Sequence, residues 1–164
     1  MNLDEYEFDE LLRAAAKAEL NAREVYEYIS NKSSNFVMKD RFDFLAKEEQ
    51  KHEEFIRDLY ERWSEEELEV PDETPVPIPY IRFDDETDES ELIEQAMDAE
   101  IASREFYRNL AKRAEESGDE EPVALLNYLG DMEQNHYDIL KSELERIKEF
   151  EEFDEYYPSM HIGP

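Results

Sequence analysis

The chain of 164 residues contains no cysteine. This absence excludes disulfides, thiolate nucleophiles, iron–sulfur clusters and cysteine-ligated zinc sites. Positive charge is also scarce, because 18 Lys and Arg stand against 47 Asp and Glu and leave a formal net charge of -29. Nucleic acids and anionic membranes bind basic protein surfaces, so we expect neither as a partner.

Long apolar runs are missing as well. No stretch approaches the roughly 20 apolar residues of a membrane-spanning helix, and the acidic N-terminus does not resemble a signal peptide. We therefore expect a cytoplasmic protein. With 40% apolar and 12% aromatic residues, the chain is nevertheless too rich in core-forming side chains to be a disordered acidic tail.

Glycine is rare, with 3 residues, while Glu, Ala and Leu dominate the long segments, and this composition favours helices. We predict one all-α domain over residues 1–164, with a tail at 151–164 that lies on the surface or at a subunit contact. The helical stretches are expected at about 4–30, 35–67, 88–117 and 122–150. Ser34 is a candidate N-cap for the second stretch, and Pro122 suits the first position of the fourth.

The segment of about 68–87 between the second and third stretches contains alternating prolines, which forbid a helix. We interpret it as a stiff connector rather than as a ligand for a proline-binding domain. Antiparallel neighbours need only about 2–8 connecting residues, whereas an extended segment of about 3.3 Å per residue can span a helix of roughly 45 Å. The segment therefore predicts a crossover, after which the third stretch runs in the same direction as the second.

Two internal repeats organise the helices. Residues 18–26 read AELNAREVY, and residues 99–107 read AEIASREFY, which is the same pattern 81 positions later. Residues 45–52 read LAKEEQKH, and residues 129–136 read LGDMEQNH, 84 positions later. The chain is thus predicted to be a duplicated helical hairpin, with hairpins at about 4–67 and 88–150.

Apolar residues at alternating steps of three and four mark one inward stripe on each helix, which is typical of a four-helix bundle. A glutamate interrupts each stripe near its middle, and two of these glutamates precede a histidine by three residues. The interrupting residues are Glu19, Glu49, Glu100 and Glu133, joined by His52 and His136. Because Glu is so common here, one such pair would fit an ordinary solvated helix face. The chain has only 3 histidines, however, and two of them occupy matching positions of the repeat.

Four inward carboxylates at one level would repel each other and lose their hydration, at a cost of several kcal/mol each. Two divalent cations would cancel the four charges, so the pattern predicts a dimetal centre. Carboxylate-rich ligation with one imidazole per metal suits iron or manganese, and the lack of thiolate argues against a structural zinc site. The third histidine, His161, has no such context and is expected to be an ordinary surface residue.

A Glu on each of two helices and a Glu-x-x-His on each of the other two resembles the ferritin-like di-iron carboxylate proteins. Residues 46–52 and 99–107 most resemble the di-iron domain of rubrerythrin. The resemblance implies a ferritin-like four-helix bundle with two Fe ions per site, or two Mn ions. It also implies the ligand roles: Glu19 and Glu100 terminal, Glu49 and Glu133 bridging, His52 and His136 each on one metal.

Three further residues take their meaning from this resemblance. Tyr26 and Tyr107 lie seven residues after the terminal glutamates, where they either hydrogen-bond a ligand carboxylate or serve as plain core tyrosines. Ser103 stands where typical rubrerythrins have another glutamate, which puts the full peroxidase mechanism in doubt. The rubredoxin domain, which needs four cysteines, is absent, so electrons would come from a separate donor protein.

Three functions compete at this point. The first is an oxidoreductase that acts in oxidative stress and reduces peroxide or oxygen at the dimetal centre. The second is a ferroxidase that handles iron as ferritins do, although the tail offers no fifth helix of the kind that caged ferritins carry. The third is a bundle with a purely structural metal site. A homodimer or small homo-oligomer fits the first function, and a cage fits the second.

Overall fold

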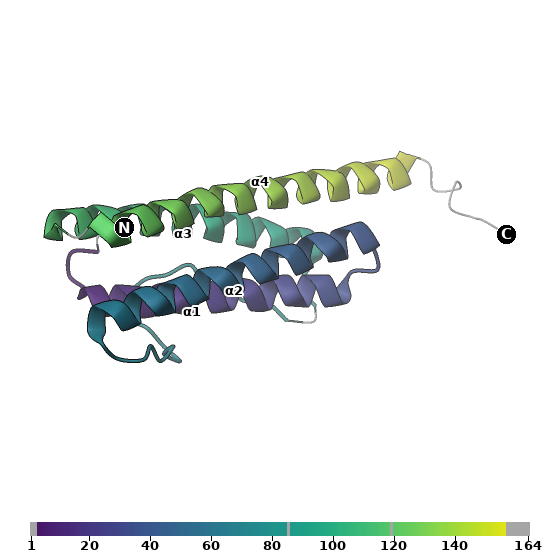
Figure 1. Ribbon diagram of the computed structural model, residues 1–164. Helices are drawn as coiled ribbons and strands as arrows, with labels where there is room; N and C mark the ends of the chain where they lie inside the picture. The colour runs from purple at the N-terminus through teal and green to yellow at the C-terminus, as the bar shows by residue number, and fades with distance from the viewer. Residues whose placement is uncertain (1–2, 85, 119, 157–164) are drawn as a thin grey trace.

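A computed structural model describes residues 3–84, 86–118 and 120–156, and these residues form four α-helices. The helices are α1 (Phe8–Lys32), α2 (Phe36–Ser64), α3 (Glu89–Ser117) and α4 (Glu120–Tyr156). Helix α1 packs along α2 and α3 packs along α4, while α1–α3 and α2–α4 contacts join the two pairs (Figure 1). The prediction of an all-α bundle of two hairpins is confirmed. None of the described helices is both long enough and apolar enough to cross a membrane.

The apolar core is divided into two clusters along the bundle axis. One cluster contains Leu12, Ile56 and Leu126, and the other contains Ile29 and Leu140, among further buried residues. Full burial of such a side chain contributes about 1.5–3 kcal/mol. A band of buried polar side chains lies between the clusters, and it consists of the repeated glutamates and histidines. Apolar packing on both sides therefore holds the polar band in place.

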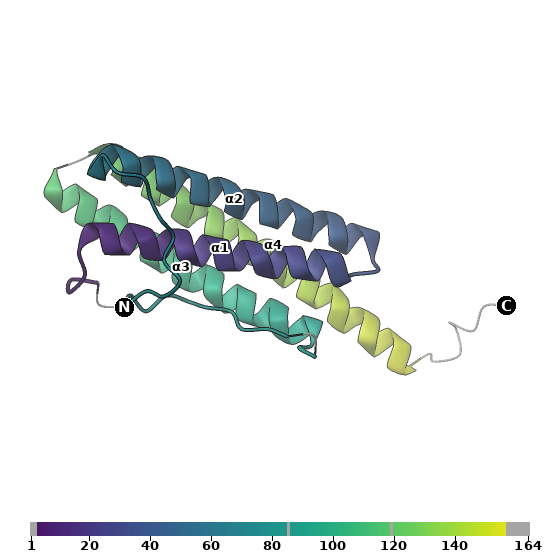
Figure 2. The same ribbon diagram turned by 90° about the horizontal axis from the view of Figure 1, so that it is seen from below.

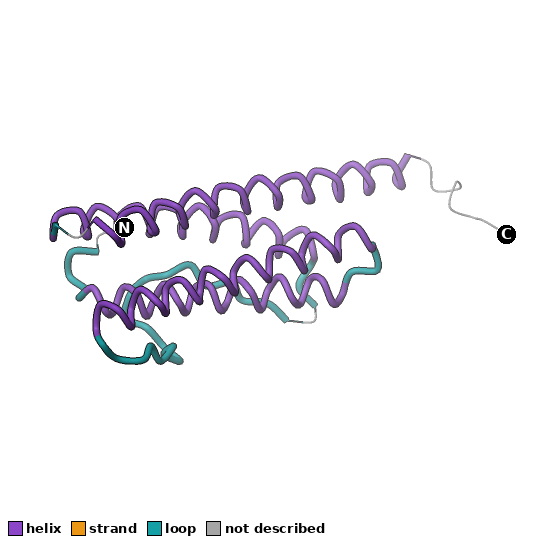
Figure 3. The backbone as a smooth tube through the Cα atoms, in the orientation of Figure 1, coloured by secondary structure: helices purple, strands orange, loops and turns teal. Residues whose placement is uncertain are grey.

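The connector from α2 to α3 follows the α1–α3 side of the bundle back to its other end (Figures 2 and 3). Helices α2 and α3 therefore run in the same direction, as the proline-rich crossover predicts. Helix side chains hold connector carbonyls in place along this path. Arg57 donates to the carbonyl of Leu68 at 2.6 Å, and the Tyr28 hydroxyl donates to that of Asp84 at 2.8 Å. The connector also buries apolar side chains, including Ile81, so it is part of the packed fold.

The ends of α1 and α2 differ from the sequence prediction. Helix α1 begins at Phe8 rather than near residue 4, because Arg113 of α3 binds the carbonyls of Leu3 and Tyr6 at 3.0 and 2.6 Å and holds this segment as a turn. Helix α2 ends at Ser64, three residues early, because Glu65 adopts a left-handed conformation with φ of 59°. Tertiary contacts and a local turn, rather than helix propensity, set these boundaries.

Helix α4 is longer than predicted at both ends. It begins at Glu120, two residues before Pro122, which still lies in the first turn where a missing N–H costs no hydrogen bond. It continues to Tyr156 because no glycine or proline follows Phe150 before residue 158. Residues 151–156 of the predicted tail are therefore helical, which corrects that boundary. Residues 157–164, including His161, lie outside the described residues.

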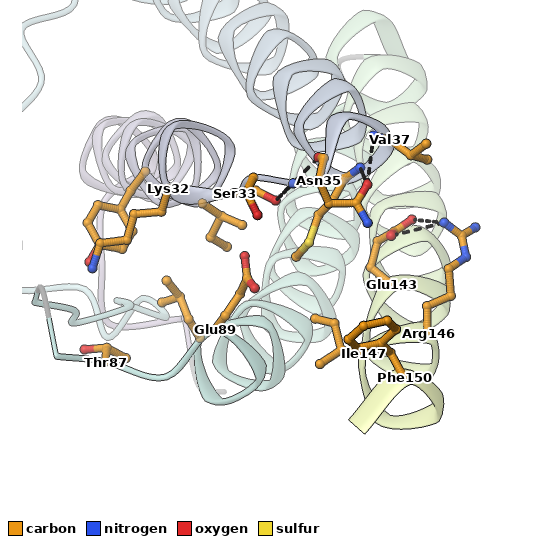
Figure 4. A pocket seen from close by; sticks show the side chains of 15 residues that line it. Lys32, Ser33, Asn35, Val37, Thr87, Glu89, Glu143, Arg146, Ile147 and Phe150 are labelled. Carbon is orange, nitrogen blue, oxygen red and sulfur yellow. Dashed lines mark hydrogen bonds and ion pairs between the residues drawn. The ribbon is translucent and has the colours of Figure 1, made fainter. Parts of the chain in front are cut away.

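At one end of the bundle α1 turns into α2 and α4 extends past the other helices (Figure 1). A cavity of about 850 Å³ opens at this end (Figure 4). Met38, Leu92 and Ile147 line its apolar part. On its rim, Glu143 accepts a hydrogen bond from Arg146 at 3.0 Å. None of the repeated glutamates and histidines lines this cavity, so it is separate from the polar band.

The N-cap of α2 is Asn35 rather than Ser34. The Asn35 Oδ1 atom accepts from the backbone N–H groups of Val37 at 3.0 Å and Met38 at 3.3 Å, while Ser34 is exposed.

We predict that Asn35→Ala lowers the free energy of unfolding by about 1 kcal/mol, because two N–H groups lose their acceptor. Chemical denaturation measures this change, with Ser34→Ala as the control. A larger loss for Ser34→Ala than for Asn35→Ala would contradict the assignment.

Candidate metal centre

The polar band places six side chains at one level of the bundle, with contributions from all four helices. All are buried: the four carboxylate residues are at most 3% exposed and the two histidines at most 1%. Their spacing explains this burial, because each lies three or four residues from apolar neighbours that face the core. The six are Glu19, Glu49, His52, Glu100, Glu133 and His136.

Two of the carboxylates face both imidazoles. Glu49 presents Oε2 to His52 Nδ1 at 3.1 Å and Oε1 to His136 Nδ1 at 2.8 Å. Glu133 presents Oε1 to His52 Nδ1 at 3.1 Å and Oε2 to His136 Nδ1 at 3.5 Å. The ligand atoms of these four residues all lie within 4.8 Å of one another. A carboxylate that offers one oxygen to each of two positions has the geometry of a bridge.

The other two carboxylates each flank one imidazole. Glu19 Oε2 lies 3.6 Å from His52 Nδ1, and Glu100 Oε1 lies 3.8 Å from His136 Nδ1. The imidazole rings stack between them with centroids 5.1 Å apart and an interplanar angle of 16°. The donors therefore fall into two matching sets that share the bridging pair, as the duplicated sequence requires.

Two tyrosines link the flanking carboxylates across the hairpins. The Tyr26 hydroxyl on α1 donates to Glu100 Oε1 on α3, and the Tyr107 hydroxyl on α3 donates to Glu19 Oε1 on α1. Burial and the neighbouring carboxylates, Glu100 for Tyr26 and Glu19 for Tyr107, raise the pKa of each phenol well above its usual range. Both phenols therefore remain protonated and keep donating to these carboxylates.

A small cavity of about 10 Å³ adjoins the carboxylates on the α1–α3 side, and this space is close to that of one water molecule. Ser103 lines it together with small residues of both helices. Pro79 and Ile81 of the connector also line it, and so does Asn21. Sequence reasoning missed these three residues. The one signal in the sequence is the repeat, in which the polar Asn21 corresponds to an alanine, Ala102.

Buried polar atoms without a hydrogen-bond partner gather in this band of the described structure. They include both oxygens of Glu49, Oε1 of Glu133 and Nδ1 of both histidines. Each such atom costs about 1–3 kcal/mol when it stays unsatisfied. Carboxylate oxygens with one imidazole nitrogen per position are the donors that iron and manganese accept. The residues present therefore fit a dimetal centre.

The acid–base balance without metal is uneven within the band. Burial, together with the charges of Glu133 and Glu49, raises the pKa of Glu19 and of Glu100 well above the usual range. Burial also acts on Glu49, but the two imidazoles outweigh it and hold its pKa below the usual range. Burial opposes the charged form of His136, yet Glu49 and Glu133 raise its pKa to about 10.

The same balance applies to the remaining pair. The pKa of His52 is raised because its three carboxylate neighbours outweigh burial. The pKa of Glu133 is lowered, since its close contacts with Glu100 and the imidazoles outweigh burial and the Glu49 charge. Without metal, the raised pKa values of Glu19, Glu100 and both histidines favour protons on these groups, while the lowered pKa values of Glu49 and Glu133 favour their ionised forms. Protons on the imidazoles therefore offset the charge of the ionised pair.

Comparison with known proteins gives one family and two solved structures. The rubrerythrin family model matches residues 10–144. A hypothetical protein from Pyrococcus furiosus is 32% identical, with a TM-score of 0.74 over 91% of this chain and 95% of that chain. A ferritin-like, diiron-carboxylate protein from Bacillus anthracis str. Ames shares the fold at 23% identity, with a TM-score of 0.68 over 88% of this chain and 99% of that chain. No curated protein gives a significant match.

Metal binding is predicted to release protons. Two divalent ions per chain would displace protons from His52 and His136, whose pKa values are raised, so we expect release of about two protons or more per two ions at pH 7. Titration of metal-free protein with Mn²⁺ in buffers of different ionisation enthalpy measures this number. The control is Glu143→Gln, because Glu143 is buried but pairs with Arg146 outside the band. Binding of two ions with release of less than one proton would contradict this protonation pattern.

Metal-free protein is predicted to lose stability as the pH rises from 5 to 8. The raised pKa values of Glu19, Glu100 and both histidines mean that the folded state holds protons that the unfolded state releases above about pH 4.5 and 6.5. That contribution is full below the unfolded pKa values and is lost as the pH passes the folded ones.

The lowered pKa values of Glu49 and Glu133 act in the opposite direction, but only as the pH falls below about 4.5. We expect Tm to fall by more than about 5 °C between pH 5 and 8, which corresponds to roughly 2 kcal/mol for a chain of this size. Thermal melts in 0.5 M salt, which screens the acidic surface, test this. A Tm that stays level or rises over this interval would disprove the prediction.

Proposed function

Because the chain belongs to the rubrerythrin family, we propose that its Glu and His band holds two iron ions and catalyses the two-electron reduction of hydrogen peroxide, with dioxygen as the second oxidant. The observation that carries this proposal is the pairing of Glu49 and Glu133, each of which turns one oxygen toward each imidazole. In this assignment, Glu19 and His52 complete one metal position, and Glu100 and His136 complete the other.

When bound, the ferrous pair supplies one electron from each ion, so that hydrogen peroxide takes up two electrons and two protons, its O–O bond breaks and two water molecules result. The chain's own residues provide the setting. Tyr26 and Tyr107 fix the orientation of Glu100 and Glu19 through hydrogen bonds from phenols that stay protonated. Ser103 lines the small cavity, and in this proposal its hydroxyl hydrogen-bonds the oxidant.

The serine at position 103 changes how the site handles oxidation. A serine side chain is too short to act as the additional carboxylate ligand that typical rubrerythrins have at this position. His52 also lies within 3.6 Å of Glu19, Glu49 and Glu133, which hold its Nδ1 toward the centre. We therefore infer that His52 remains a ligand in both oxidation states and that the site rearranges little on cycling.

The electrons come from a separate donor protein in this proposal, since the chain has no cysteine for a rubredoxin domain. The acting form is proposed to be a homodimer or small homo-oligomer in the cytoplasm. Aromatic side chains on the outward sides of α2 and α4 support an interface. Phe44, Phe55 and Tyr128 are 38–49% exposed, and the rings of Phe55 and Tyr128 meet edge to face at 6.4 Å.

Peroxide consumption tests the proposal. Anaerobic protein loaded with two Fe(II) per chain should oxidise both ions with one equivalent of hydrogen peroxide, release no O₂, and turn over when a reductant such as dithionite-reduced viologen is supplied. Glu133→Ala should slow this reaction at least about 100-fold because it removes a bridge, while Glu143→Gln should leave the rate unchanged.

Two results would favour the alternatives. Continued oxidation of added Fe(II) with accumulation of a mineral, and no turnover with reductant, would identify a ferroxidase that handles iron. Metal that binds tightly but reacts with neither peroxide nor O₂ would identify a structural site. Particle size separates the same cases, because a dimer or small oligomer fits the oxidoreductase and a large cage fits storage.

A further inference from the structure

The helices leave the centre open on the α1–α3 side. The positions that face each other there carry small side chains, namely Ala18 and Ala22 on α1 and Ala99 and Ser103 on α3. Small residues cannot close the space between two helices by themselves. Glu19, Glu49, Glu100 and Glu133 all border the cavity that remains. This side is therefore the one on which a small molecule can reach the carboxylates.

The connector forms the outer wall of this space. Pro79 and Ile81 line the cavity, and Ile81 is only 4% exposed because it packs with the apolar cluster beside the centre. The prolines of the connector keep it extended as it passes over the bundle. With the wall in place, about 10 Å³ is left inside, which is enough for a molecule of about the size of water.

One buried side chain fastens this wall to the bundle. Asn21 of α1 accepts from the Ile81 N–H at 2.8 Å and donates through Nδ2 to the Ile81 carbonyl at 3.3 Å. Asn21 is 3% exposed, so water cannot easily replace it. The repeat has Ala102 at the corresponding position of α3, which shows that the hairpin itself does not need an amide here. These two hydrogen bonds between Asn21 and Ile81 form a clamp on the connector.

We propose that the clamp makes the connector a size filter, which admits hydrogen peroxide and dioxygen to the centre and excludes alkyl hydroperoxides. The proposal rests on the proposed function and names its substrate class. Hydrogen peroxide and dioxygen, with two heavy atoms each, exceed the cavity only slightly, so a small shift of the wall lets them in. A hydroperoxide with an aromatic or branched alkyl group, in contrast, is several times larger than the cavity. Its entry requires residues 79–81 to move outward, which breaks both hydrogen bonds of the clamp and exposes the Ile81 side chain.

Other contacts hold the connector on either side of the clamp. Tyr28 binds the carbonyl of Asp84, while Arg57 binds that of Leu68 and Arg13 that of Glu69. Loss of Asn21 should therefore loosen the middle of the connector without detaching its ends. Tyr28→Phe is the matched control, because it removes one hydrogen bond between α1 and the connector and keeps the ring that packs on Phe83 at 4.6 Å.

Amide exchange in the metal-loaded protein tests the clamp directly. In Asn21→Ala, the Ile81 N–H should exchange at least about 10-fold faster than in wild type, since it loses its acceptor and the segment opens more often. The helical amides of α2 and α4 should be unchanged, and Tyr28→Phe should keep the wild-type rate at Ile81. An unchanged Ile81 rate in Asn21→Ala would overturn the proposal.

Substrate preference tests the filter. The ratio of kcat/KM for cumene hydroperoxide to that for hydrogen peroxide should rise at least about 10-fold in Asn21→Ala and stay constant in Tyr28→Phe. Ile81→Ala removes part of the wall but keeps the backbone groups of the clamp, so it should raise the ratio without speeding exchange. Faster exchange with an unchanged ratio would show that the connector opens but does not select, and would also overturn the proposal.

Failure of the proposed function gives a different result. If the iron-loaded wild type reduces neither hydroperoxide, the peroxidase assignment fails while the filter remains testable by access of another bulky molecule. Removal of bound Fe(II) by 2,2′-bipyridine should then be at least about 10-fold faster in Asn21→Ala than in wild type or Tyr28→Phe. Equal removal rates in all three proteins would reject the filter.

Discussion

The cost of burying like charges organises this protein. Four carboxylates and two imidazoles lie at one level of a narrow bundle, almost without solvent. Such a group is stable only when its charges cancel, either through protons or through cations. Both means are available here: without metal, the raised pKa values of the imidazoles and of Glu19 and Glu100 favour protons that offset the charge, and two divalent ions would balance four carboxylates. The apolar clusters on both sides supply the packing that keeps these groups together.

Duplication explains how one chain meets this requirement. Each hairpin contributes one flanking carboxylate, one bridging carboxylate and one histidine, and neither hairpin completes a metal position alone. The tyrosines also link the hairpins, because Tyr26 of the first hairpin donates a hydrogen bond to Glu100 of the second, and Tyr107 of the second donates to Glu19 of the first. Residues far apart in sequence must therefore meet before any of the proposed ligand sets is whole, so metal binding there would be coupled to docking of the two hairpins.

The sequence predicts the bundle and the inward side chains because helical periodicity specifies which residues share a face. The repeat then distinguishes Glu19 from the many exposed acidic residues and identifies His52 as one of two histidines at matching positions. Periodicity does not specify the partners of a helix end, so the start of α1 depends on Arg113 and that of α2 on Asn35 rather than Ser34.

The connector shows the same limit more clearly. Alternating prolines predict its extended form and its crossover, but they carry no information on which helix faces it covers. The contact of the connector with the centre depends on Asn21, which stands outside the apolar stripe of α1. The repeat marks Asn21 as unusual beside Ala102, but only the folded chain shows that its amide is buried and binds the connector. Ligand roles likewise depend on atom positions, such as the opposite oxygens of Glu49, that a residue pattern does not contain.

The connector also removes the symmetry that duplication creates. The repeat relates α1 to α3 and α2 to α4, so the two metal positions of the proposed centre would have identical sets of donor types. The connector is a single segment, so it cannot follow that two-fold relation. It places Pro79 and Ile81 beside α1 and α3, and these helices differ at two matching positions: Asn21 corresponds to Ala102, and Ala22 to Ser103. Two ions with equivalent ligands would thus have different electrostatic surroundings. Their redox potentials and their spectroscopic signals would therefore differ from each other.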